Sequence, residues 1–185
     1  YWRDWSSDVC SSDLRWTTQG SESNNINNHP HPCDGGWLVH NGVLPDYYDI
    51  KETFSVPPVS DCDSEMLAIA LAEAPGADIA KKAEWMLKTC QPSGRSPLVV
   101  LALWHNRLTA IRQGNPLTTY STVEGTYLSS LPVPTLINAG KPSVIKDDSV
   151  MEWRLTAERV RRTVLPLEGR PYRTLAPAKY DWWGK

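Results

Sequence analysis

Residues 29–42 read HPHPCDGGWLVHNG, a short apolar run between two histidine-containing motifs, HPH at residues 29–31 and HNG at residues 40–42. Two more motifs flank this stretch: RWTTQG lies before it at residues 15–20, and SDCDSE follows it at residues 60–65. Arginine, histidine, aspartate and asparagine bind charged groups and polarise carbonyls. The side chains suited to chemistry are therefore concentrated in the first 65 residues.

Length and composition describe an ordinary globular protein. The 185 residues fit one domain with a sizeable core, and 41% hydrophobic and 22% charged residues are typical values. No segment approaches the roughly 18 apolar residues of a membrane span, and no signal peptide is visible, so we expect a cytoplasmic protein without a membrane partner. A net charge of −2 makes nucleic-acid binding an unfavoured function.

Four cysteines, Cys10, Cys33, Cys62 and Cys90, have no CxxC spacing. In a chain of this size without a secretion signal, this pattern favours free thiols in a reducing compartment.

Hydrophobic periodicity predicts an α/β layered arrangement. A short strand over residues 37–40 ends at an Asn41-Gly42 turn, and a helix over 63–74 begins at Asp63 or Ser64 as N-cap. A second helix over 77–90 carries one apolar stripe, made of Ile79, Ala83, Met86, Leu87 and Cys90. Strands are expected over 98–104, 108–112, 117–121, 126–130 and 143–146. Loop, strand, two helices and a strand meander favour a layered sandwich.

The motifs together resemble the glutamine-binding half of a class II glutamine amidotransferase, the N-terminal-nucleophile kind. RQGNPL at 112–117 and EGTYLSSLP at 124–132 extend the resemblance over about residues 15–155. HPH at 29–31 is closest to the glucosamine-6-phosphate synthase glutaminase type, although Gln19 stands where that branch has histidine. The resemblance implies an α+β fold, a four-layer αββα sandwich of the Ntn-hydrolase type, N-terminally truncated here.

The same resemblance implies hydrolysis of L-glutamine to glutamate and ammonia. Arg15, assisted by Thr18, would bind the substrate carboxylate, and Asp63 would bind its ammonium group. Trp16 lies in what that family uses as a loop closing over glutamine, and His29 would lie near the substrate. The alternatives are a solvated surface charge for Arg15, a core position for Trp16 and a plain helix cap for Asp63.

Asn41 and Gly42 are the expected electrophilic pair. A side-chain amide and a backbone N–H can stabilise the oxyanion of a tetrahedral intermediate. Asn-Gly is also the commonest hairpin turn, which is the structural alternative. The apolar residues and His40 before the pair match the family pattern and favour the oxyanion hole.

His29 and His31 with Cys33 close by also invite a metal hypothesis. The spacing matches none of the usual structural zinc patterns, and the family carries HPH without a metal. We therefore expect no metal and no cofactor, and a substrate-side role for His29.

The nucleophile of that family is a cysteine at the mature N-terminus, whose α-amine accepts the proton. This chain begins YWRDWSSDVCSSDL, which resembles translated sequencing adapter, so residues 1–14 are expected to be an artefact. None of the four cysteines has a free α-amine, and we expect this copy to be inactive. The alternative function is a non-catalytic glutamine-binding or sensing module.

The expected organisation follows from these assignments. Residues 1–14 are the suspected artefact, 15–155 the amidotransferase domain lacking its N-terminal strands, and 156–185 a basic, proline-containing tail. The expected partners are L-glutamine and a separate synthase subunit that receives ammonia. A truncated product without a cellular role is a further alternative.

Overall fold

The computed structural model describes residues 24–104, 106–155 and 160–167. Arg15, Trp16 and Thr18, like the suspected artefact at 1–14, lie outside the described residues. No helix in the described part has both the length and the apolar character required to cross a membrane.

The centre of the molecule is a six-stranded sheet in which every neighbouring pair is antiparallel. In spatial order its strands are β1 (His31–Cys33), β2 (Gly36–Gly42), β3 (Leu98–Trp104), β4 (Arg107–Gln113), β8 (Ser149–Leu155) and β9 (Val160–Pro166). Strand β3 is apolar along most of its length, as expected for a central strand with buried residues on both faces: Leu98, Val100 and Ala102 lie in the main core, and Val99 lies in a smaller cluster.

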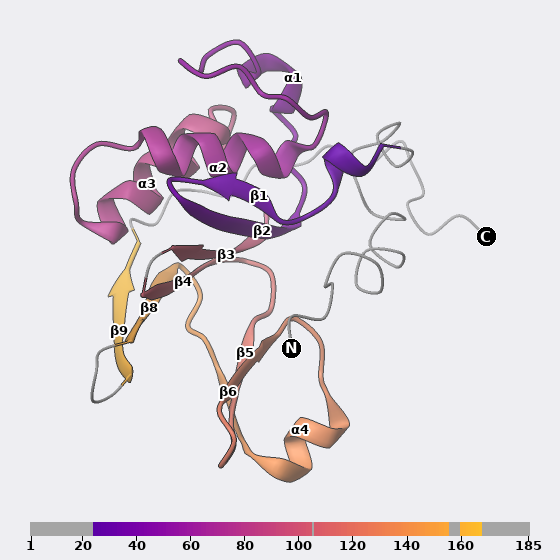
Figure 1. The fold of residues 1–185 in the computed structure, drawn as a ribbon, viewed down its shortest axis with the longest axis vertical. Helices are drawn as coiled ribbons and strands as arrows, with labels where there is room; N and C mark the ends of the chain where they lie inside the picture. Colours follow the sequence, from indigo (N-terminus) through magenta and orange to yellow (C-terminus); the bar gives the residue numbers. More distant parts are fainter. Residues whose placement is uncertain (1–23, 105, 156–159, 168–185) are drawn as a thin grey trace.

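Helices α2 (Asp63–Glu73) and α3 (Ile79–Cys90) cover one face of this sheet next to β1 and β2 (Figure 1). The buried residues of α3 are the five of its predicted stripe, and Asp78 caps it by accepting the Ala80 and Lys81 N–H groups. Short helices η2 (Asn25–Asn27) and α1 (Tyr47–Ile50) lie in the connections before α2. The main core fills the space between α2, α3 and the sheet.

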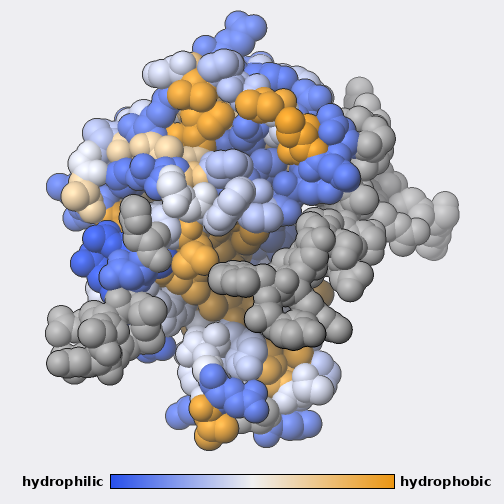
Figure 2. Space-filling model, viewed as in Figure 1, coloured by the Kyte–Doolittle hydropathy of each residue, from blue (hydrophilic) through white to orange (hydrophobic). Residues whose placement is uncertain are grey.

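A second, three-stranded sheet lies beside the other face of the large one. Its order is β6 (Thr126–Ser129), β5 (Thr118–Ser121) and β7 (Lys141–Val144), and helix α4 (Pro134–Ala139) joins β6 to β7. A smaller apolar cluster containing Val99, Leu117 and Ile145 joins the two sheets. The cover is partial, because Trp37, Val39 and Leu103 on β2 and β3 remain exposed. Figure 2 shows hydrophobic surface between the helical layer and the small sheet.

The α+β sandwich predicted from the sequence is confirmed. Residues 98–104 form β3 with the predicted bounds, and the other predicted strands are found within a few residues. The predicted Asn41-Gly42 turn is wrong, since both residues are the last two of β2 and pair with Val99 and Leu98. Strand β9 pairs with β8 along its whole length, so the sheet extends past residue 155, where the sequence predicts a tail.

Candidate functional site

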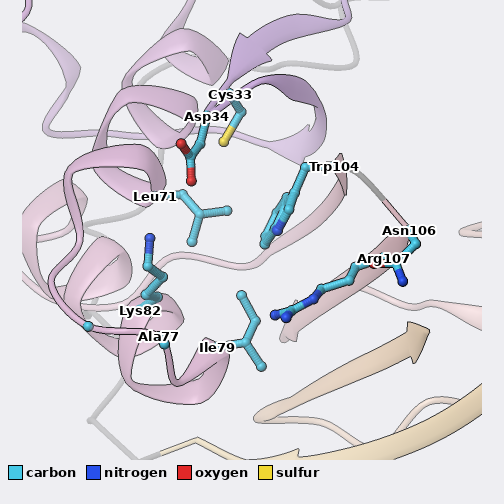
Figure 3. A pocket seen from close by; sticks show the side chains of 10 residues that line it. Cys33, Asp34, Leu71, Ala77, Ile79, Lys82, Trp104, Asn106 and Arg107 are labelled. Atoms are coloured by element: carbon cyan, nitrogen blue, oxygen red, sulfur yellow. The ribbon is translucent and has the colours of Figure 1, made fainter. Parts of the chain in front are cut away.

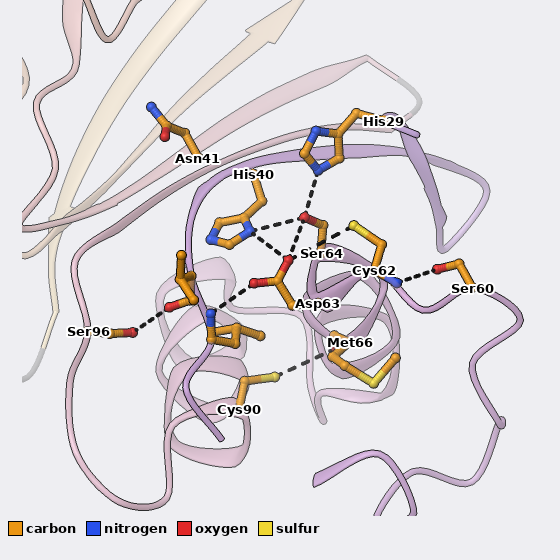
Figure 4. A network of polar contacts seen from close by, with 12 residues as sticks. His29, His40, Asn41, Ser60, Cys62, Asp63, Ser64, Met66, Cys90 and Ser96 are labelled. Atoms are coloured by element: carbon orange, nitrogen blue, oxygen red, sulfur yellow. Dashed lines mark hydrogen bonds and ion pairs between the residues drawn. The ribbon is translucent and has the colours of Figure 1, made fainter. Parts of the chain in front are cut away.

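Three histidines meet the first turn of α2 in the area expected to bind substrate. Alternation along β2 turns His40 towards the helical layer, while His31 is the first residue of β1 and His29 lies two residues before it. Asp63 and Ser64 come from the N-terminal turn of α2 (Figure 4). We call these five residues the polar cluster.

Asp63 anchors the cluster without capping its helix. Its Oδ2 accepts the Leu44 backbone N–H at 2.9 Å, and the N-cap residue of α2 is Cys62, whose side chain makes no capping bond. The predicted Asp63 or Ser64 cap is therefore wrong. The preceding loop is held instead by Glu65, which accepts N–H groups of Val59 at 3.0 Å and Ser60 at 2.6 Å. Asp63 is thus tied to the β2–α1 connection.

Ser64 connects three members of the cluster. Its Oγ lies 2.6 Å from His29 Nε2 and 3.1 Å from His40 Nδ1, and it donates to Asp63 Oδ1 at 3.3 Å. A hydroxyl has one proton and two lone pairs. If the proton goes to Asp63, both rings must donate, which assigns N–H to His29 Nε2 and to His40 Nδ1.

Burial keeps two of the imidazoles neutral. The pKa of His40 is lowered to about 4 by desolvation, although nearby Asp63 acts in the opposite direction. The pKa of His31 is lowered to about 4, again mainly by burial and next by His29. His40 Nδ1 lies 3.8 Å from Asp63 Oδ1, a contact that would be an ion pair only with a protonated ring. At neutral pH it is a contact between a carboxylate and a neutral imidazole.

Asn41 and Gly42 occupy different surroundings. The Asn41 side chain is exposed on the face of β2 opposite His40, and Figure 4 shows it pointing away from Asp63. The backbone carbonyl oxygen of Asn41 accepts a hydrogen bond from the Asn115 side-chain amide at 3.0 Å. Gly42 packs against the cluster, since a Cβ there would lie 2.7 Å from Pro97 O and 2.8 Å from His40 Nε2. Only Gly42 of this pair touches the cluster.

A separate cavity of about 450 Å³ opens elsewhere on the helical side of the sheet. Figure 3 shows Cys33, Asp34, Lys82, Trp104 and Arg107 around it. Of the predicted substrate and oxyanion residues that the structure describes, His29, Asn41, Gly42 and Asp63, none lines this cavity. Burial raises the pKa of Cys33 to about 12, so its thiol is protonated and a poor nucleophile.

The structure brings His29, Asp63 and Gly42 into one neighbourhood and leaves the Asn41 side chain on the other face. The sequence interpretation assigns no substrate-binding or catalytic role to His40, Ser64 or Cys62, although each lies inside a quoted motif. The sequence feature that could have indicated these residues is that each is adjacent to Asp63 or Asn41. Their contacts with one another, however, depend on the packing of α2 on β2.

Comparison with family models gave no match. Among curated proteins, glutamine–fructose-6-phosphate aminotransferase (isomerizing) of Thermus thermophilus is 31% identical over 173 residues, 91% of this chain and 27% of that protein. Its counterpart in Aquifex aeolicus is 29% identical over 164 residues, covering 85% of this chain and 26% of that protein. The chain spans about a quarter of the length of these relatives.

Solved structures show the same fold. Glutamine phosphoribosylpyrophosphate amidotransferase from B. subtilis superposes with a TM-score of 0.60 at 13% identity, covering 76% of this chain and 32% of that one. A glutamine aminotransferase class-II domain protein from Silicibacter pomeroyi gives 0.57 at 15% identity, covering 77% and 73%. From the sequence relatives and this fold together, we conclude that the chain belongs to the class II glutamine amidotransferase domain family.

Proposed function

We propose that this domain binds L-glutamine and that Asp63 binds the substrate ammonium group. The observation that carries the proposal is the fixed carboxylate of Asp63, only 8% exposed and held by the Leu44 N–H. A carboxylate fixed by a backbone donor loses little conformational entropy when a cation binds it. His29 and His40, joined to Asp63 through Ser64, would line the same area.

The proposed reaction is hydrolysis of glutamine to glutamate and ammonia. In this proposal Gly42, beside His40, would offer its backbone N–H to an oxyanion, and Asn41 would contribute after turning its exposed side chain. Arg15, Thr18 and Trp16 remain the proposed carboxylate and loop residues. The two curated relatives are named for glutamine and fructose-6-phosphate, so we infer that ammonia passes to a sugar-phosphate acceptor on a synthase domain or subunit.

Turnover needs a nucleophile that the described cysteines do not offer. Cys33 and Cys90 are buried, and burial raises the pKa of both thiols. Cys62, like the others, is internal and has its α-nitrogen in a peptide bond. We therefore expect the 185-residue polypeptide to bind glutamine without hydrolysing it.

Isothermal titration calorimetry with L-glutamine, in buffer containing EDTA, tests the proposal. The wild-type polypeptide should bind L-glutamine and not D-glutamine. Asp63→Asn should weaken binding at least about 30-fold, because truncating one partner of a buried charge pair costs about 2 kcal/mol or more. Asp61→Asn is the matched control, since its exposed carboxylate pairs with Lys51 outside the cluster. A folded wild-type chain with no affinity for L-glutamine would contradict the proposal.

A glutamate-release assay on the same preparation tests turnover. Binding without glutamate release fits the expected lack of a nucleophile. Glutamate release that depends on L-glutamine and disappears in Asp63→Asn would show that the predicted lack of hydrolysis is wrong. If a full-length form with its natural N-terminus also binds glutamine without releasing glutamate, that result would support the glutamine-sensing alternative.

A further inference from the structure

We propose that His29, His31 and Cys62 form a binding site for a thiophilic divalent metal ion such as Zn²⁺. One potential ligand atom from each of the three side chains lies within 4.8 Å of the other two. His31 and Cys62 are buried, with 3% and 2% exposure, and His29 is half-buried. The site is thus open to solvent on the His29 side.

Its thiol is not the one that the sequence places next to the histidines. Cys33, two residues after His31, lies on the cavity side and donates its Sγ–H to Ala68 O at 3.4 Å. Cys62 comes from the N-cap position of α2, and packing of α2 against β1 brings it to the two imidazoles. A spacing rule applied to residues 29–33 therefore cannot detect this site.

The three side chains are of the types that bind zinc, and their ligand atoms lie somewhat farther apart than in a tetrahedral zinc site. Two imidazoles and a thiolate are ordinary zinc ligands, and three protein ligands leave a fourth position for water or another molecule. Tetrahedral zinc places neighbouring nitrogen and sulfur ligands about 3.3–3.6 Å apart. Atoms as far apart as 4.8 Å must therefore approach by about 1.2–1.5 Å, and rotation of the half-buried His29 ring can provide this movement. His31 Nε2 has no hydrogen-bond partner among the described residues, so this nitrogen can offer its lone pair to a metal ion.

The site adjoins the proposed glutamine site. Cys62 Sγ lies 4.0 Å from Asp63 Oδ1, and His29 contacts Ser64 at 2.6 Å. A bound dication would place positive charge beside the carboxylate proposed to bind the substrate ammonium, and like charges at this distance repel. Metal and glutamine should therefore weaken each other's binding by the same factor. This antagonism rests on the proposed function, whereas metal binding itself does not.

Cobalt titration of the untagged, EDTA-treated and reduced chain tests the metal site. All proteins carry Cys10→Ser, so that this remaining thiol does not contribute. We expect one equivalent of Co²⁺ to give tetrahedral visible bands and a thiolate charge-transfer band, and Zn²⁺ to displace it.

Two ligand variants and one control decide the assignment. Cys62→Ser should abolish the charge-transfer band, and His31→Gln should weaken Co²⁺ binding more than about 100-fold, beyond the usual loss from an outer-shell change. Cys33→Ser is the matched control and should keep both signals. Circular dichroism confirms that each variant is folded. Absence of the charge-transfer band in the parent chain, or its persistence in folded Cys62→Ser, would overturn the metal site.

The antagonism has its own readout. Glutamine affinity measured with saturating Zn²⁺ should be at least about tenfold lower than with EDTA, and Cys62→Ser should remove that difference. Metal binding with unchanged glutamine affinity would refute the antagonism alone. Metal binding by a chain that does not bind glutamine would refute the proposed function alone.

Discussion

The first turn of α2 and the middle of the same helix are buried alike but surrounded by different chemistry. Asp63 and Ser64 are 8% and 1% exposed, while Met66 and Leu67 are fully buried. The middle of the helix packs in the main apolar core, and its backbone carbonyls accept thiol protons from Cys33 and Cys90. The first turn packs against imidazoles, two of which have an Nε2 without a partner in the described part of the chain.

The difference shows that burial alone does not distinguish core from site along this helix. Apolar burial contributes stability through area and packing, whereas buried polar groups contribute only when their partners are present. The unused nitrogens of His31 and His40 therefore represent stability given up in the first turn. Such a local compromise is expected where a protein binds a ligand.

The largest effect on stability should come from the middle of α2. Met66→Ala should lower the free energy of unfolding by about 2–5 kcal/mol, because a buried methionine is replaced by a cavity. Chemical denaturation measures the loss, and Val59→Ala, an exposed position in the preceding loop, should change it by less than about 0.5 kcal/mol. If Met66→Ala lost as little stability as Val59→Ala, the middle of α2 would not differ in apolar packing from its first turn.

Acidification should act on the first turn. The pKa of His40 is about 4 in the folded protein and about 6.5 when unfolded, so the unfolded state binds more protons between these values. This contribution to stability is complete above pH 6.5 and is lost as the pH falls towards 4, by roughly 3 kcal/mol. Denaturation of metal-free protein across this range should show a shallower pH dependence in His40→Asn. An unchanged slope in that variant would assign the effect to other groups.

Gly42 should test how tightly β2 packs on the cluster. Gly42→Ala should cost about 2–3 kcal/mol, because its Cβ would meet Pro97 O and the His40 ring. Gly125 has nearly the same φ, +158° against +156°, but open space around it, so Gly125→Ala controls for backbone strain. Equal losses in the two variants would show that strain, not contact with His40, sets the cost.

The smallest effect is expected for Ser64. Ser64→Ala should cost about 1 kcal/mol, the net value of a typical hydrogen bond. Imidazole nitrogen NMR is the more informative measurement, because the wild type should show N–H at His29 Nε2 and His40 Nδ1. These tautomers should lose their preference in Ser64→Ala, and identical spectra would contradict the role of Ser64 as their acceptor.

Local patterns predicted much of the fold because they report local physics. The stripe of α3 reflects burial of one helix face, and the apolar run of β3 reflects burial on both strand faces, in the main core and in the smaller cluster. Both were found with nearly the predicted bounds. The start of α2 was misread because Asp63, a good cap by type, is used by Leu44, a partner nineteen residues away. β1 was missed because three residues carry no measurable period.

The amino-acid sequence by itself determined the family and the α+β class, and it predicted Asp63, His29 and Gly42 as site residues. The residue types in these motifs are informative because each supplies a particular donor, acceptor or charge. Only the tertiary structure decided which of these side chains meet. The alternation of β2 separates Asn41 from His40, and the packing of α2 on β1 selects Cys62 over Cys33 as the thiol beside the histidines. Such choices depend on long-range packing, which sequence spacing does not specify.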